Sequence, residues 1–107
     1  MGNNNEESIE NKIPIKFSCY EDKKLENKTF YFEPDSTISQ MIAKFNKITK
    51  FERKHRSLRS LIYGVYYEYV YKGYPLRSRS QELLRDVFKE DDNIKIIINV
   101  SYGCFIF

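Results

Sequence analysis

The sequence predicts a single α+β domain in which one main helix packs across a small mixed sheet of four to five strands. Apolar and polar residues alternate over residues 13–19 and again over residues 94–100, which is typical of strands with one buried face. Between these segments, residues 37–48 carry an apolar stripe with helical spacing. A chain of 107 residues has room for one modest core, so we expect one domain over residues 13–100.

The first part of the chain is predicted to be a tail followed by a hairpin. Residues 1–12 (MGNNNEESIENK) are polar and lack periodicity, which predicts a disordered N-terminal tail. The alternating segment 13–19 and the aromatic run 29–32 (TFYF) predict two strands joined by a polar loop. Pro34 ends the second strand because proline cannot donate to a strand ladder.

The main helix has both a start signal and an apolar stripe. Asp35, Ser36 and Thr37 are each suitable helix N-caps. The positions that follow at i, i+3, i+4 and i+7 are apolar, which predicts a helix over residues 37–48 with one buried side. These stripe residues are Ile38, Met41, Ile42 and Phe45.

A basic segment, at about residues 49–65, follows the helix. The spacing of Leu58, Leu61, Ile62 and Val65 predicts a second, shorter helical turn before Gly64. The basic side chains either form a solvated helix face or contact anionic lipid, where each Lys or Arg near the surface adds to binding. They are Lys50, Arg53, Lys54, Arg56 and Arg59.

The remainder of the chain is predicted to add two strands and a short helix. The aromatic and β-branched run 66–71 (YYEYVY) predicts a strand, and residues 72–75 (KGYP) predict a turn. Leucines, Val and Phe within residues 83–88 predict a short amphipathic helical piece. The alternation over residues 94–100 then predicts the last strand.

The residue pattern does not support catalysis or metal binding. His55 is the only histidine and lies in a basic run, while four glycines form no phosphate-binding loop. The net charge of +3 is too small to indicate nucleic-acid binding. Cys19 and Cys104, in a chain without an apolar leader after Met1, fit free thiols in a reducing compartment. We therefore expect a non-enzymatic monomer with no cofactor, no metal and no nucleic-acid partner.

The C-terminal tail, residues 101–107, ends in a prenylation-type box. Its last four residues (CFIF) place Cys104 fourth from the end, an aliphatic residue third and Phe last, which indicates geranylgeranylation. The alternative is an apolar strand end that contains a cysteine. No apolar run approaches the length of about 20 residues that spans a bilayer, so any membrane contact is predicted to be peripheral.

Four motifs, in order along the chain, resemble the ubiquitin family. They are the strand-to-helix junction at 32–38 (FEPDSTI), the helix end at 43–45 (AKF), the turn at 71–76 (YKGYPL), and Leu83 with Asp86 followed by residues 93–96 (NIKI). The resemblance runs from about Ile13 to Val100 and implies the β-grasp fold. It also implies that Val70 and Ile97 keep two apolar positions of ubiquitin's recognition patch. Lys95 replaces the patch histidine, and Tyr69 is the neighbouring aromatic residue that we include in a predicted client-binding face.

Two departures from ubiquitin resemble the membrane-anchored ubiquitin-fold proteins. The segment after the helix is enlarged, and the tail carries a prenylation box where ubiquitin has Gly-Gly, although the spacer 101–103 is shorter than that subfamily's linker. This resemblance implies an adaptor that holds a ubiquitin-conjugating enzyme or another client at the cytoplasmic face of a membrane, the plasma membrane first. It further implies that the basic segment and Cys104 lie on one side of the domain and form a two-part anchor.

Two other functions stay open from the sequence. Gly103 falls on the position of ubiquitin's terminal glycine, so removal of residues 104–107 would give a modifier that is conjugated through Gly103. Alternatively, the chain is a ubiquitin-like interaction domain of a larger protein, and its Gly-Cys-Phe junction resembles the start of an intein-like segment.

Overall fold

A computed structural model describes residues 11–54 and 63–104. The predicted tail up to residue 10, the middle of the basic segment with Arg56 and Arg59, and the last three residues lie outside the described residues. The elements, in order, are β1 (Ile13–Cys19), the 3-10 helix η1 (Lys23–Asn27), β2 (Phe30–Phe32), α1 (Ile38–Thr49), α2 (Phe51–Lys54), β3 (Tyr63–Tyr71), β4 (Tyr74–Leu76), α4 (Leu84–Phe88) and β5 (Ile94–Cys104).

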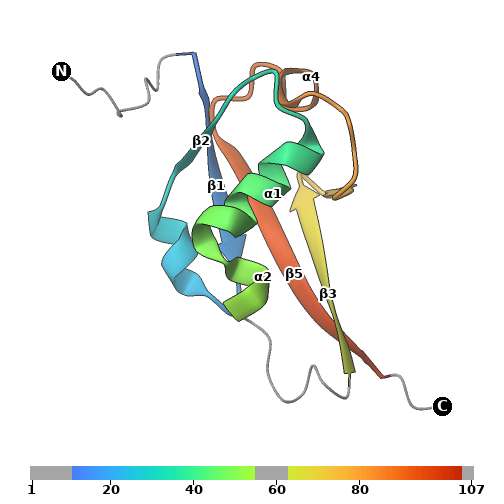
Figure 1. Ribbon diagram of the computed structural model, residues 1–107. Helices are drawn as coiled ribbons and strands as arrows, with labels where there is room; N and C mark the ends of the chain where they lie inside the picture. Colours follow the sequence, from blue (N-terminus) through green and yellow to red (C-terminus); the bar gives the residue numbers. More distant parts are fainter. Residues whose placement is uncertain (1–10, 55–62, 105–107) are drawn as a thin grey trace.

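The five strands form one mixed sheet, and α1 lies across one of its faces (Figure 1). The strand order is β2-β1-β5-β3-β4, in which β1 and β5 run parallel and every other neighbouring pair runs antiparallel. The predicted α+β class, with one main helix on a mixed sheet, is therefore confirmed.

Helix α1 begins with a capping box. Thr37 Oγ1 accepts from the Gln40 backbone N–H at 3.0 Å, and the Gln40 side chain accepts from the Thr37 N–H at 2.9 Å. Thr37 is thus the residue, of the three candidates, that caps the helix. The chain leaves the helix at Lys50, which adopts a left-handed conformation with φ of 56°. The predicted apolar stripe of α1 is buried against the sheet.

The core between α1 and the sheet is built mainly from aromatic rings. The Phe17 and Phe45 rings stack with centroids 4.0 Å apart, which joins the centre of β1 to the centre of α1. Phe51, at the start of α2, packs against Phe45 and has no exposed surface. The remaining fully or nearly buried aromatic residues are Phe30, Phe32, Phe88, Tyr69 and Tyr71.

The structure corrects the edges of two predictions on either side of β3. Val65 lies in β3 opposite Tyr102 of β5, so it does not belong to the predicted helical turn. The other residues of that prediction, Leu58, Leu61 and Ile62, lie outside the described residues. The helical spacing was misleading because Val65 also fits a two-residue period with Tyr67, Tyr69 and Tyr71. Pairing with β5 provides the backbone hydrogen bonds of this segment. The turn predicted over 72–75 is confirmed at Lys72 and Gly73, where the chain reverses between β3 and β4, while Tyr74 and Pro75 belong to the short strand β4.

Strand β5 continues beyond residue 100 to Cys104, so the boundary that we drew between domain and tail lies inside this strand. Its last part pairs with the beginning of β3, where Gly64 faces Gly103 and Tyr63 faces Cys104. Strand β1 pairs with β5 only as far as Ile98. The two strands β3 and β5 therefore extend past the rest of the sheet as a ribbon (Figure 1).

Candidate protein-docking face

The face of the sheet that points away from α1, here called the outer face, carries the predicted interaction residues. Strand alternation sends Ile96 into the core with no exposed surface and leaves the next residue, Ile97, 47% exposed. In the ladder, Ile97 of β5 lies directly opposite Val70 of β3. Val70 in turn faces Pro75 of β4, so an apolar band crosses three strands.

A pair of lysines borders this band. Lys95 of β5 lies directly opposite Lys16 of β1, two residues along from Ile97, and both lysines are exposed. Neither forms an ion pair with a described residue. Like charges directly opposite one another destabilise a sheet, so an acidic group bound between the two ammonium groups would relieve this repulsion.

The other border of the band is polar. Asn99 of β5 faces Glu68 of β3, and its Nδ2 donates to Glu68 Oε1 at 3.4 Å. The outer face is therefore ordered from basic through apolar to acidic along the strands. Such an arrangement fits a protein surface with an apolar centre and carboxylates on one side.

Tyr69 does not belong to this face, and the prediction that it contacts a client is wrong. Its side chain points to the helix side and is only 2% exposed, since odd-numbered residues of β3 face the core. Its hydroxyl donates to Glu52 Oε2 at 2.7 Å and accepts from Asn46 Nδ2 at 2.9 Å. Burial, and then the bond to Glu52, raise the pKa of Tyr69.

These bonds instead attach α2 to the domain. The Glu52 N–H donates to Asn46 Oδ1 at 3.1 Å, and the Tyr67 hydroxyl donates to the Glu52 carbonyl at 2.9 Å. Of the predicted basic patch, Lys50 is exposed at the end of α1, while Arg53 and Lys54 lie in α2. Arg56 and Arg59 lie outside the described residues.

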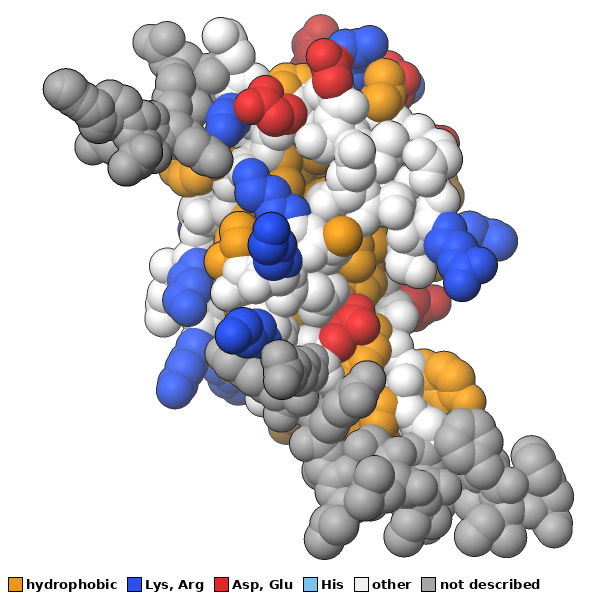
Figure 2. Space-filling model, viewed as in Figure 1, with side chains coloured by type: hydrophobic (Ala, Val, Ile, Leu, Met, Phe, Trp, Pro, Cys, Tyr) orange, Lys and Arg blue, Asp and Glu red, His pale blue; other side chains and the backbone are white. Residues whose placement is uncertain are grey.

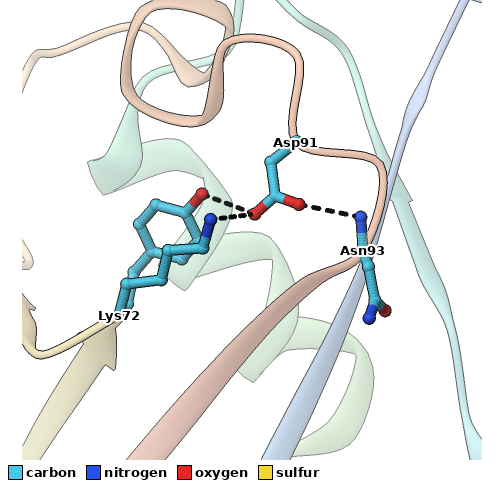
Figure 3. Close-up of polar contacts among 4 residues, drawn as sticks. Lys72, Asp91 and Asn93 are labelled. Atoms are coloured by element: carbon cyan, nitrogen blue, oxygen red, sulfur yellow. Dashed lines mark hydrogen bonds and ion pairs between the residues drawn. The ribbon is translucent and has the colours of Figure 1, made fainter.

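A cluster of polar contacts around the Asp91 carboxylate lies just before β5 (Figure 3). Asp91 accepts from the Tyr71 hydroxyl at 2.6 Å and from the Asn93 backbone N–H at 2.9 Å, and Lys72 Nζ lies 3.3 Å from it. The bond from Tyr71, followed by that from Asn93, lowers the pKa of Asp91. The cluster joins the end of β3 to the loop before β5.

The two cysteines are too far apart for a disulfide. Cys19 lies opposite Ile98, so Cys104 is six residues further along β5, about 20 Å at the usual rise of a strand. Cys19 is a free thiol with 1% exposure, and burial raises its pKa, which makes it a core residue rather than a nucleophile. Gly103 and Cys104 are the last two residues of β5.

The described residues hold no group of three or more side chains suited to binding a metal ion. Within the same part of the chain, no helix is long and apolar enough to cross a bilayer.

Solved structures show which fold this is. The chain matches the ubiquitin-like domain of yeast Ddi1 with a TM-score of 0.56 and 13% identity, over 85% of this chain and 91% of that one. It matches Trypanosoma brucei ATG8 with a TM-score of 0.58 and 14% identity, over 88% and 77%. A ubiquitin-like domain of an Arabidopsis thaliana protein matches with a TM-score of 0.56 and 11% identity, over 94% and 88%. This chain has the ubiquitin-like β-grasp fold.

No protein-family model and no curated protein matches the chain. The comparisons therefore show the fold alone. The resemblance to ubiquitin correctly pointed to Val70, Ile97 and Lys95 as neighbours on one face. It missed Lys16 and Pro75. Strand alternation along β1 could have placed Lys16 on the outer face, and the turn after β3 could have placed Pro75 beside that strand.

Proposed function

We propose that this chain is a non-enzymatic adaptor whose outer face docks a protein client, with a ubiquitin-conjugating enzyme as the first candidate. The observation that carries the proposal is the register that sets Ile97 opposite Val70 beside the lysine pair Lys16 and Lys95. A half-exposed isoleucine in an open apolar band can become buried only against another molecule, and that burial favours binding.

The basic side of the outer face defines the kind of client. Lys16 and Lys95 favour a surface that presents Asp or Glu next to an apolar side chain. The Glu68–Asn99 border repels a carboxylate placed on the opposite side, so the client is accepted in one orientation.

The membrane part of the proposal concerns Cys104. We propose that a prenyl group on this cysteine holds the adaptor at a membrane, as the resemblance to membrane-anchored ubiquitin-fold proteins implies. The intact mass of the protein from its native cells tests this directly. A C-terminal Cys104 with an isoprenoid and a methyl ester is the expected result. A C-terminus at Gly103 would instead assign the chain to the conjugated modifiers.

Client docking is tested with two variants that make the same change on opposite sides of the domain. Ile97→Asp places a charge in the apolar band, whereas Ile48→Asp changes an isoleucine of similar exposure, 56%, on helix α1. Against a panel of ubiquitin-conjugating enzymes in calorimetry, we expect Ile97→Asp to weaken binding by at least about tenfold. Ile48→Asp should bind the enzyme like the unchanged chain. Equal affinities for all three proteins, or no binding to any enzyme of the panel, would refute this client.

A further inference from the structure

A second surface lies on the helix side of the domain, where η1 meets the end of α1. Five exposed lysines surround this place, and we call them the lysine patch: Lys23, Lys24, Lys28, Lys47 and Lys50. Figure 2 shows basic side chains gathered at the lower left, over η1 and the end of α1, with no acidic side chain visible among them. Only one of the five, Lys50, belongs to the basic run that the sequence singled out.

An exposed isoleucine stands inside the lysine patch. Ile48 is 56% exposed, although it lies in α1, whose other large apolar residues are buried. Together with Lys24 and Lys28 it lines a cleft of about 510 Å³ between η1 and α1. On the adjoining turn Tyr20 is 86% exposed, and Lys23 Nζ lies 5.4 Å from its ring centroid.

The positive charge of the patch is only partly offset by its surroundings. Asp22 lines the same cleft and the exposed Glu21 precedes it, but Glu26 accepts from the Ser18 hydroxyl at 3.3 Å, and Ser18 lies on the outer face. None of the five lysines forms an ion pair with a described residue. The patch therefore presents free ammonium groups around an aliphatic side chain.

The neighbouring edge of the sheet is closed to an added peptide strand. Pro14 faces Tyr31 and has no N–H, so the Tyr31 backbone groups point away from β1 to the free edge of β2. Lys44 Nζ donates to the Tyr31 carbonyl at 3.3 Å, and the same ammonium lies 5.5 Å from the Phe32 ring centroid. A peptide that pairs with β2 would first have to displace this lysine.

We propose that the lysine patch is a docking surface for an anionic membrane. Lysine stems lie along apolar surface while their ammonium groups reach phosphate and carboxylate headgroups, and Ile48 and Tyr20 suit the boundary between headgroups and acyl chains. The patch lies at the end of the domain to which the parallel strands β1 and β5 both run, and β5 leads to Cys104. The inference rests on the proposed membrane role and supplies the second contact that a single lipid chain needs.

The patch can be tested without any lipid on Cys104, so its failure is separable from that of prenylation or client docking. The unlipidated full chain is sedimented with vesicles of phosphatidylcholine alone and with vesicles that also contain phosphatidylserine. We expect binding only to the second kind, weakened by salt. Each charge is worth about a fivefold change in partitioning, so the double variant Lys47→Glu and Lys50→Glu should lose more than about 100-fold.

A matched double variant controls for net charge. Arg77→Glu and Arg79→Glu change the charge equally but lie after β4, at the opposite edge of the sheet from β2. This variant should retain most of the vesicle binding. Equal losses in both double variants, or no binding to phosphatidylserine vesicles, would overturn the proposal.

Insertion of Ile48 has its own readout, because the chain contains no tryptophan. With Ile48→Trp, we expect emission to shift to shorter wavelength on phosphatidylserine vesicles and to be quenched by brominated lipid. Tyr74→Trp, at an exposed site on β4, should show neither effect. If a soluble polyglutamate peptide shifts the Ile48→Trp emission as strongly as the vesicles do, the patch belongs to an acidic protein partner and the membrane proposal fails.

Discussion

The two faces of the sheet use adjacent residues for opposite purposes. On the inner face, Ile96 joins Phe17 and Phe45 in a core without exposed surface. On the outer face, Ile97 and Val70 form an apolar band that no described element covers. The inner face thus accounts for stability, and the outer face keeps apolar area available for a partner. This difference teaches that an apolar residue in this sheet can be assigned to stability or to binding once it is known which face its position in the strand alternation points to.

The largest expected effect comes from the same substitution on the two faces. Ile96→Asp leaves an unpaired carboxylate in the aromatic core and should lower the free energy of unfolding by more than about 4 kcal/mol. Ile97→Asp should lower it by only about 1 kcal/mol, because the carboxylate reaches water and the main cost is the low strand propensity of Asp. Urea denaturation of both variants measures the difference. Comparable destabilisation by the two changes would show that the faces are not distinct.

A smaller effect is expected at Tyr69, which we predicted on the client-binding face and which the structure places in the core. Tyr69→Phe keeps the ring but leaves Glu52 and Asn46 without their hydroxyl partner. We expect a loss of about 1–3 kcal/mol in the free energy of unfolding, with client affinity unchanged. Tyr74→Phe, at a tyrosine that is 73% exposed, is the matched control and should leave stability unaltered. If Tyr69→Phe keeps full stability but loses client binding, Tyr69 contacts the client and belongs to the docking face after all.

The helix start provides a third and weaker comparison. Thr37→Ala removes the side-chain half of the capping box and should cost about 1 kcal/mol in the free energy of unfolding. Ser36→Ala, one residue earlier, should cost less, because the cap hydrogen bond is made by Thr37. Thermal unfolding of the two variants separates them, and a greater loss at Ser36 would mean that the helix begins earlier than described.

The smallest effect is a pH dependence at the cluster that starts β5. Because the folded-state pKa of Asp91 is lowered, its stabilisation is present above the unfolded pKa of about 3.9 and is lost as pH falls through the folded value. Asp91→Asn should therefore lower the urea midpoint at neutral pH. The gap to the unchanged chain should close in strongly acidic solution. A gap of the same size at all pH values would show that the Asp91 charge does not contribute.

The sequence was sufficient for elements with a long, regular pattern. The stripe on α1 and the alternation in β1 and β5 predicted both the elements and their buried sides, because burial selects apolar residues at a fixed period. Strand β4 could not be predicted, since it is three residues long, contains Pro75, and forms only by pairing with β3. The start of β3 was obscured because Val65 satisfies helical and strand spacing at once.

The candidate site was predicted in part for similar reasons. Resemblance to ubiquitin found Val70, Ile97 and Lys95, which the sheet brings together from two strands. The resemblance did not indicate that Tyr69 faces the core. Strand alternation could have shown this, because Tyr69 is two residues from both Tyr67 and Tyr71 and therefore lies on the same face of β3 as they do. The lysine patch could not be predicted, because Lys24 and Lys28 come from η1 and its end while Lys47 comes from α1, and only the tertiary structure shows that these two elements lie next to each other.

The central claim is that the outer face, rather than the helix side, binds the protein client. Its most direct test is a methyl NMR titration of the isoleucine-labelled chain with a ubiquitin-conjugating enzyme. Ile97 reports on the outer face, Ile48 on the helix side and Ile96 on the core. We predict that the Ile97 methyl signal shifts or broadens while those of Ile48 and Ile96 stay in place. A shift confined to Ile48, with Ile97 unmoved, would contradict the account.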